Sequence, residues 1–131
     1  MTHRPYQDQL GHPADFKVHY RFFEESEGGR KILPCQGYRS DFWYYTPDNT
    51  FPHQVYMIWP EFLDKSGLVI IDKAIEIPRQ GNALMWVIDP KRRSFHYKYI
   101  IKGLKGFFME GQRKVAGCEV IEVIGLKTNP G

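Results

Sequence analysis

The sequence lacks the features that place a protein in or across a membrane. No apolar run approaches the ~20 residues of a membrane-spanning helix, and residues 1–9 lack the apolar core of a secretory signal. The chain also has no G-x-x-x-x-G-K-[ST] motif, the phosphate-binding loop of many nucleotide hydrolases. We therefore expect a cytoplasmic protein that neither spans a membrane nor binds GTP.

Residues that commonly carry catalysis or bind metal are scarce and scattered. The only two cysteines, Cys35 and Cys118, lie far apart and are expected to be reduced thiols that pack as small apolar side chains. The histidines show no metal-ligand spacing, and no serine lies in a nucleophile elbow. The sequence therefore gives no reason to expect an enzyme, a metal site or a cofactor.

Positive charge is unevenly distributed along the chain. Lys and Arg number 18 against 15 Asp and Glu, a net charge of +3. Residues 73–114 hold ten Lys and Arg against three acids, whereas residues 1–50 hold six against seven. Such a concentration of charge favours an anionic partner.

Residues 15–46 predict two strands joined by a glycine turn. Large apolar side chains alternate with polar ones from Phe16 to Phe22, which is typical of a half-buried strand. The pair Gly28-Gly29 allows a turn with positive φ. Aromatic residues crowd positions 38–45, as β-propensity favours. We expect these two strands to form a hairpin.

The remaining sequence predicts further strands. Residues 54–59 and 67–72 are expected to be short strands that flank a loop or a turn of helix at 60–66, and residues 83–89 a central strand. A basic turn at 89–94 is expected to precede a strand over 95–101, followed by a hairpin of residues 104–110 and 113–124 around Gly111-Gln112. The prediction is an all-β fold, a single closed antiparallel barrel over 15–126, with a flexible arm at 1–14 and a tail at 127–131.

Three motifs, in order, resemble a known family. The first is Glu27-Gly28-Gly29-Arg30 followed by Pro34, Gly37-Tyr38-Arg39, Phe42 and Tyr44; the second is E-I-P-R-Q-G-N at 76–82; the third is M-E-G-Q-R-K-V-A-G at 109–117. Together they are similar to the C-terminal β-barrel, domain III, of bacterial translation elongation factor Tu. The resemblance implies a barrel of this type without the GTPase domain, with residues of about 51–75 as an insertion.

The resemblance also implies an RNA-binding surface. In the family, the segments around the two glycine turns and the G-Y-R strand contact the T stem of aminoacyl-tRNA. The matching candidates here are Arg30, Lys31, Arg39, Gly111, Gln112 and Arg113. Asp41 stands where the family has a neutral amide and would repel a phosphate. The alternative is that these motifs only build hairpins, with Arg39 paired to a carboxylate.

A second candidate surface follows from charge alone. Lys91, Arg92, Arg93, Lys98 and Lys102, with His96 and Lys105 between or beside them, form a basic strip with no acid. Lys and Arg neutralise phosphates, which gives salt-dependent affinity for nucleic acids. The alternative is a solvated basic face. On the predicted strand, the interleaved aromatic residues face the core.

These observations predict a translation-linked, RNA-binding module, with tRNA as the candidate ligand. The alternative is a protein-interaction module that binds a translation-factor partner or forms a homodimer. For that role we expect an exposed aromatic patch in the insertion, at Tyr56, Trp59 and Phe62.

Overall fold

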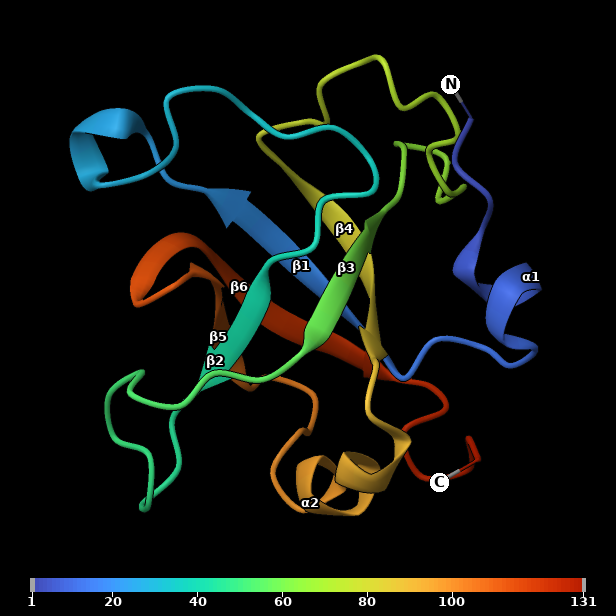
Figure 1. Ribbon diagram of the computed structural model, residues 1–131, viewed down its shortest axis with the longest axis vertical. Helices are drawn as coiled ribbons and strands as arrows, with labels where there is room; N and C mark the ends of the chain where they lie inside the picture. The colour runs from blue at the N-terminus through green and yellow to red at the C-terminus, as the bar shows by residue number, and fades with distance from the viewer. Residues whose placement is uncertain (1, 131) are drawn as a thin grey trace.

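The computed structural model describes residues 2–130 and contains one antiparallel sheet (Figure 1). In chain order the elements are α1 (Tyr6–Leu10), β1 (Phe16–Phe22), η1 (Glu25–Glu27), β2 (Asp41–Tyr44), β3 (Ile58–Phe62), β4 (Gln80–Val87), η2 (Pro90–Arg92), α2 (Arg93–Tyr97), β5 (Lys105–Glu110) and β6 (Arg113–Val123). The six strands have the order β2-β5-β6-β1-β4-β3. The sheet curls into a half-barrel, so the fold is mostly β, as predicted.

The predicted closed barrel is wrong, because β2 and β3 are the two edges of an open sheet. Phe42 in β2 exchanges backbone hydrogen bonds of 2.9 and 2.8 Å with Tyr56, just before β3. This contact is an isolated bridge and does not extend into a ladder. β2 is only four residues long, and β3 contains Pro60, which has no N–H to donate. The edges therefore approach each other without pairing along their length.

The first strand provides the centre of the core, as its sequence pattern predicts. Its alternate residues Phe16, Val18, Tyr20 and Phe22 are fully buried, and the residues between them are exposed or half-buried. Phe62 from β3 and Phe108 from β5 pack against the Tyr20 ring. The concave face of the half-barrel is thus filled by aromatic side chains.

The predicted hairpin of β1 and β2 does not form. β1 lies between β6 and β4, whereas β2 pairs with β5 at the edge of the sheet. The long connection over 23–40 includes η1 and the positive-φ glycines Gly28 and Gly37, and it carries the chain away from β1 (Figure 1). A glycine turn in the sequence shows where the chain bends, but it does not fix which strand pairs with which.

The predicted final hairpin is confirmed. β5 and β6 are antiparallel neighbours, and Glu110 pairs with Arg113 across a turn of Gly111 and Gln112. Gly111 has φ of 62°, which a glycine adopts without strain. The two-residue loop therefore sets the register of this hairpin.

The middle of the chain differs from its prediction. Residues 60–62, expected in a loop, belong to β3, and residues 67–72 contact the sheet through an isolated bridge of Leu63 and Val69 instead of forming a strand. The strand predicted over 83–89 is confirmed as β4, between β1 and β3. Its nearly continuous apolar run has a reason, because Trp86 is buried under Tyr6 of α1 while Met85 faces the main core.

The strand predicted over 95–101 is wrong, because Arg93–Tyr97 is the helix α2. Asp89 begins the preceding 3₁₀ turn by accepting a 3.1 Å hydrogen bond from the Lys91 amide, and Pro90 follows it at the first position. A capping Asp and a Pro at the first position are helix-start signals. The alternation of aromatic residues over 95–101 predicted a strand, but these helix-start signals are the ones that the structure follows.

Both terminal segments are folded onto the sheet. Residues 2–14, expected to be a flexible arm, include α1, the buried Tyr6 and the buried His3. At the other end, Asn129 Nδ2 donates to the Pro13 carbonyl over 2.8 Å and to Asp15 Oδ1 over 2.9 Å. These side-chain contacts, which have no periodic sequence signal, tie down both ends.

Candidate nucleic-acid interface

The first and third sequence motifs converge on one carboxylate, Glu110, at the end of β5. The Tyr38 hydroxyl donates to Glu110 Oε2 over 2.5 Å, Arg30 forms an ion pair with the same oxygen, and Arg113 Nη2 donates to Oε1 over 3.0 Å. The Arg30 guanidinium also lies over the Tyr38 ring at 5.1 Å. We call Arg30, Tyr38, Glu110 and Arg113 the turn cluster.

The charge of the turn cluster is largely compensated within it. Partial burial acts to raise the pKa of Glu110, but hydrogen bonds from Tyr38, Arg30 and Arg113 outweigh it, so the pKa lies below its ordinary value. The carboxylate therefore stays ionised at neutral pH and holds both arginines. One excess positive charge is left on the cluster, with exposed Lys31, Gly111 and Gln112 around it.

Arg39 is not part of the turn cluster. Its guanidinium lies over the Trp59 ring, 4.3 Å from the ring centre. Within residues 2–130 it forms no ion pair, so the alternative in which Arg39 pairs with a carboxylate is wrong. The hydroxyl of the neighbouring Tyr38 instead donates to Glu110, so these two consecutive residues belong to different sites on the surface.

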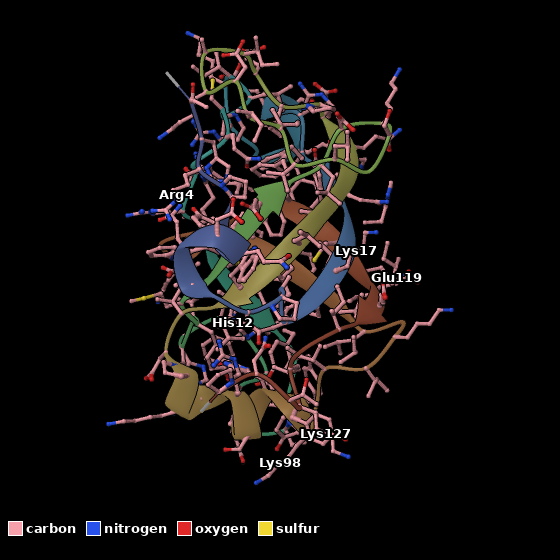
Figure 2. All side chains as sticks on the ribbon, turned by 90° about the vertical axis from the view of Figure 1, so that its right-hand side faces the viewer. Arg4, His12, Lys17, Lys98, Glu119 and Lys127 are labelled. Carbon is pink, nitrogen blue, oxygen red and sulfur yellow. The ribbon has the colours of Figure 1, made fainter. Side chains whose placement is uncertain are left out.

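Exposed cations gather around α2 at one end of the molecule. We call Lys91, Arg92, Lys98 and Lys127, together with the exposed Tyr97, the basic cap. Lys91, Lys98 and Lys127 line one cavity of about 550 Å³ with Tyr97, and the Lys127 ammonium lies 5.4 Å from the centre of the Tyr97 ring. Figure 2 shows Lys98 and Lys127 at this same end. Lys102 follows, exposed, in the loop to β5.

The basic cap is less compensated than the turn cluster. In the described part of the chain, none of its four cations forms an ion pair. One acid, Asp89, is adjacent and is used to cap η2. Because Arg93–Tyr97 is a helix, the Tyr97 side chain is 42% exposed. On the predicted strand it would have faced the core. An exposed ring among free lysines can stack on a base while the lysines hold phosphates.

Two residues of the predicted basic strip, Arg93 and His96, are buried, although Arg93 also lines the cavity beside Tyr97. Arg93 is 6% exposed; its Nε donates to Asp15 Oδ1 over 2.7 Å, and its Nη2 donates to the Val87 carbonyl over 3.2 Å. His96 is 1% exposed and lies 2.8 Å from the Tyr44 hydroxyl through Nδ1. Arg93 is therefore a structural residue, because its guanidinium is already occupied.

The aromatic residues expected to bind a partner do not form an exposed patch. Tyr56 and Phe62 are buried in the core, and Trp59 is half-buried beneath Arg39. A group of three exposed apolar side chains, Leu68, Ile71 and Ile75, lies farther along the chain, around a cavity of about 520 Å³ with an acidic rim. The sequence pattern predicted a strand over 67–72 and gave no sign that Leu68 and Ile71 would be exposed.

Across residues 2–130, no His, Cys, Asp or Glu side chains form a group that could hold a metal ion. The helices described there are too short and too polar to cross a membrane. Both cysteines are free thiols, and burial raises the pKa of Cys118.

No protein-family model matches the chain, and no curated protein is similar to it in sequence. The resemblance to elongation factor Tu is therefore carried by the three motifs alone.

The burial of His96 predicts an acid-sensitive fold. Burial, with a smaller contribution from the charge of Arg92, lowers the pKa of His96 to about 4. The unfolded chain binds the proton near pH 6.5, so this stabilisation is complete above that pH and is lost as the pH falls toward 4. Between pH 7 and pH 4.5 the free energy of unfolding should fall by about 2–3 kcal/mol from this group. Urea titrations at both pH values measure it.

The matched comparison uses a histidine on the surface. His96→Gln should lose this part of the pH dependence, whereas His53→Gln, at an exposed histidine, should keep it. Equal pH dependence in the two variants would show that His96 is not the titrating group.

Proposed function

We propose that this protein binds RNA through the basic cap, with the turn cluster as a second contact. The observation that carries the proposal is the group of exposed, unpaired cations around the exposed ring of Tyr97. Lysines that make no ion pair can neutralise phosphates without first breaking an internal contact. The resemblance to a tRNA-binding barrel supports the same ligand class.

The positions of the two contacts favour a structured RNA over a single nucleotide. β5 connects them, because its first residue, Lys105, follows the loop from α2 and its last residue, Glu110, is in the turn cluster. Five steps along a strand cover roughly 17 Å at ~3.4 Å per residue. A ligand that contacts both ends of β5 must span at least this distance, as a folded stem does.

Titration of labelled tRNA at several salt concentrations tests the proposal. We expect affinity to fall steeply with salt, as phosphate contacts require. The double variant Lys98→Gln/Lys127→Gln should bind on the order of tenfold more weakly and lower the salt slope by roughly 1–2, one for each lost phosphate contact. Duplex DNA of similar length tests whether the geometry of RNA matters.

A charge-matched variant separates a site from a general effect of net charge. Lys17→Gln/Lys65→Gln removes the same charge outside the basic cap and should keep the wild-type slope. Equal losses in both double variants would assign the affinity to net charge alone. No binding to tRNA even at low salt would discard RNA as the ligand.

The second candidate function is self-association through the exposed apolar side chains Leu68, Ile71 and Ile75. Large apolar side chains that remain exposed next to each other can mark a protein interface. Sedimentation over a range of protein concentrations distinguishes the candidates. A homodimer would persist in Lys98→Gln/Lys127→Gln, which removes only the proposed phosphate contacts.

A further inference from the structure

A second basic site lies where the N-terminal segment meets the connection before β2. Side chains and backbone from three separate stretches enclose a cavity of about 470 Å³, lined by Thr2, His3, Arg4, Tyr6, Gln9, Gly37, Arg39 and Lys73. We call it the basic pocket. Figure 2 shows Arg4 beside α1, away from Lys98 and Lys127 of the basic cap.

The cations of the basic pocket have no carboxylate partner. Arg4, Arg39 and Lys73 form no ion pair within residues 2–130, and no Asp or Glu lines the cavity. Like charges gathered around one cavity repel each other, so an anion that enters it relieves this repulsion. The pocket is therefore complementary to a ligand with more than one negative charge.

Two of these cations are positioned by their surroundings. The Arg39 guanidinium lies over the Trp59 ring, 4.3 Å from the ring centre, and interacts with the Tyr6 side chain, so its orientation is restricted. Lys73 reaches the pocket across Gly37, because a Cβ on that glycine would lie 3.1 Å from Lys73 Cε and 3.3 Å from Nζ. Gly37 thus keeps space for the lysine.

The one nearby buried carboxylate is already satisfied. Glu61 is 1% exposed and accepts hydrogen bonds from His3 Nε2 over 2.6 Å, the Tyr6 amide over 2.8 Å and Trp86 Nε1 over 3.2 Å. It lies behind the residues that line the pocket and does not occupy Arg4, Arg39 or Lys73. Its hydrogen bonds instead hold His3 and Tyr6 in the wall of the pocket.

We propose that the basic pocket binds the terminal phosphoryl group of a small phosphate ester. A phosphate monoester carries a charge of about −1.5 to −2 at neutral pH and three acceptor oxygens. A planar Arg fork suits two of these oxygens, and a lysine suits the third as a point charge. A monocarboxylate offers one charge and two oxygens, so it would leave most of the positive charge uncompensated.

Titration followed by ¹H–¹⁵N spectra of the whole chain tests the assignment, with inorganic phosphate as the probe. Saturable shifts are expected for amides of residues 2–9, 37–39 and 73, and not for those of α2. Acetate at the same ionic strength should give none of these shifts. Absence of the shifts with millimolar phosphate, or equal shifts with acetate, would overturn the proposal.

Variants of two side chains that line the pocket, exposed Arg39 and half-buried Lys73, assign the contacts. Arg39→Gln and Lys73→Gln should each weaken phosphate binding about tenfold, the loss of one charge-assisted hydrogen bond. Lys65→Gln removes an equal charge from a neighbouring exposed lysine that does not line the pocket. An equal loss in Lys65→Gln would overturn the site.

A final comparison separates two sources of the same phosphoryl group. A short single-stranded RNA is titrated with and without a 5′-phosphate, alongside glycerol 3-phosphate as a small ester. Pocket shifts with the ester assign the site to small molecules. Shifts only with the 5′-phosphorylated RNA would overturn the small ester as ligand. This result is independent of the basic cap, because Lys98→Gln/Lys127→Gln leaves the pocket intact.

Discussion

Asp15→Asn should lower the free energy of unfolding by about 3–5 kcal/mol, the usual cost of breaking a buried ion pair from one side. Asp15 is fully buried and accepts hydrogen bonds from Arg93 Nε over 2.7 Å, the Val87 amide over 2.7 Å and Asn129 Nδ2 over 2.9 Å. An asparagine keeps the shape but loses the charge, and its NH₂ group must face one of these donors. Arg93 is then a buried charge without a counterion.

Urea unfolding of matched variants measures this effect. Asp48→Asn changes an exposed carboxylate and should alter stability by less than about 0.5 kcal/mol. The slope of unfolding against urea should be unchanged in both variants, because the surface exposed on unfolding is the same. A loss below 1 kcal/mol in Asp15→Asn would show that the pair does not hold the N-terminal and C-terminal segments to β4.

The ion pair with Asp15 determines whether Arg93 stabilises the fold or binds phosphate. If Arg93 bound phosphate, Arg93→Met would weaken RNA binding and leave stability unchanged. The structure predicts the opposite, a loss of stability with RNA affinity per folded molecule retained. In a double-mutant cycle, Asp15→Asn and Arg93→Met together should cost less than the sum of the single changes, because each removes the charge that the other leaves unpaired.

Local sequence patterns predicted the strands whose two faces differ clearly in polarity. The alternation from Phe16 to Phe22 reflects a strand with one face in the core. The Gly111-Gln112 turn predicted the β5–β6 hairpin, because a two-residue loop leaves little choice of partner. Such a short-range signal predicts both a strand and the strand that pairs with it.

Longer-range pairing had no comparable signal. Nothing local states that β1 pairs with β4 and β6 while β2 pairs with β5. The same reason explains the closed barrel, since closure depends on whether β2 and β3 pair along their length, and the structure has one bridge there. Aromatic residues do alternate at 95–101. However, Asp89 caps the helical turn that precedes this segment, and Pro90 is the first residue of that turn, so the chain enters the segment with helical geometry.

Surface residues were predicted where their exposure depends on the nearby sequence, and missed where it depends on residues far away in the chain. Exposed Lys98 and Lys102 were predicted from charge density alone, whereas the burial of Arg93 depends on Asp15, far away in sequence. The turn cluster could be anticipated only through the family resemblance, which brought Arg30, Tyr38 and Arg113 together. The basic pocket could not be predicted, because residues 2–9 show no pattern and their position depends on one buried side chain.

That side chain is Glu61, and Glu61→Leu should release the N-terminal segment from the sheet. The substitution leaves the Tyr6 amide, His3 Nε2 and Trp86 Nε1 without an acceptor. A buried donor that loses its partner costs about 1–3 kcal/mol, so keeping the segment docked with three such donors would cost roughly 3–9 kcal/mol in total. Undocking is the cheaper response, and the loss of global stability is then limited to the free energy of docking.

Hydrogen exchange distinguishes undocking from global unfolding. In Glu61→Leu the Gly11 amide, which donates to the Gln7 carbonyl at the end of α1, should exchange much faster, while amides of β1 and β6 keep most of their protection. His3→Ala should add little to Glu61→Leu, because its partner is already gone. Unchanged exchange at Gly11 would show that other contacts hold the segment.

The same variant connects the fold to the basic pocket. Arg4, Tyr6 and His3 reach the pocket only when the segment is docked, so Glu61→Leu should lose phosphate binding together with protection of α1. Arg39→Gln should weaken phosphate binding about tenfold and leave most of that protection in place, because the hydrogen bonds of Glu61 with His3 and the Tyr6 amide remain. Phosphate should in turn slow the exchange of the Gly11 amide in the wild-type chain, since a ligand that binds only the docked state stabilises it.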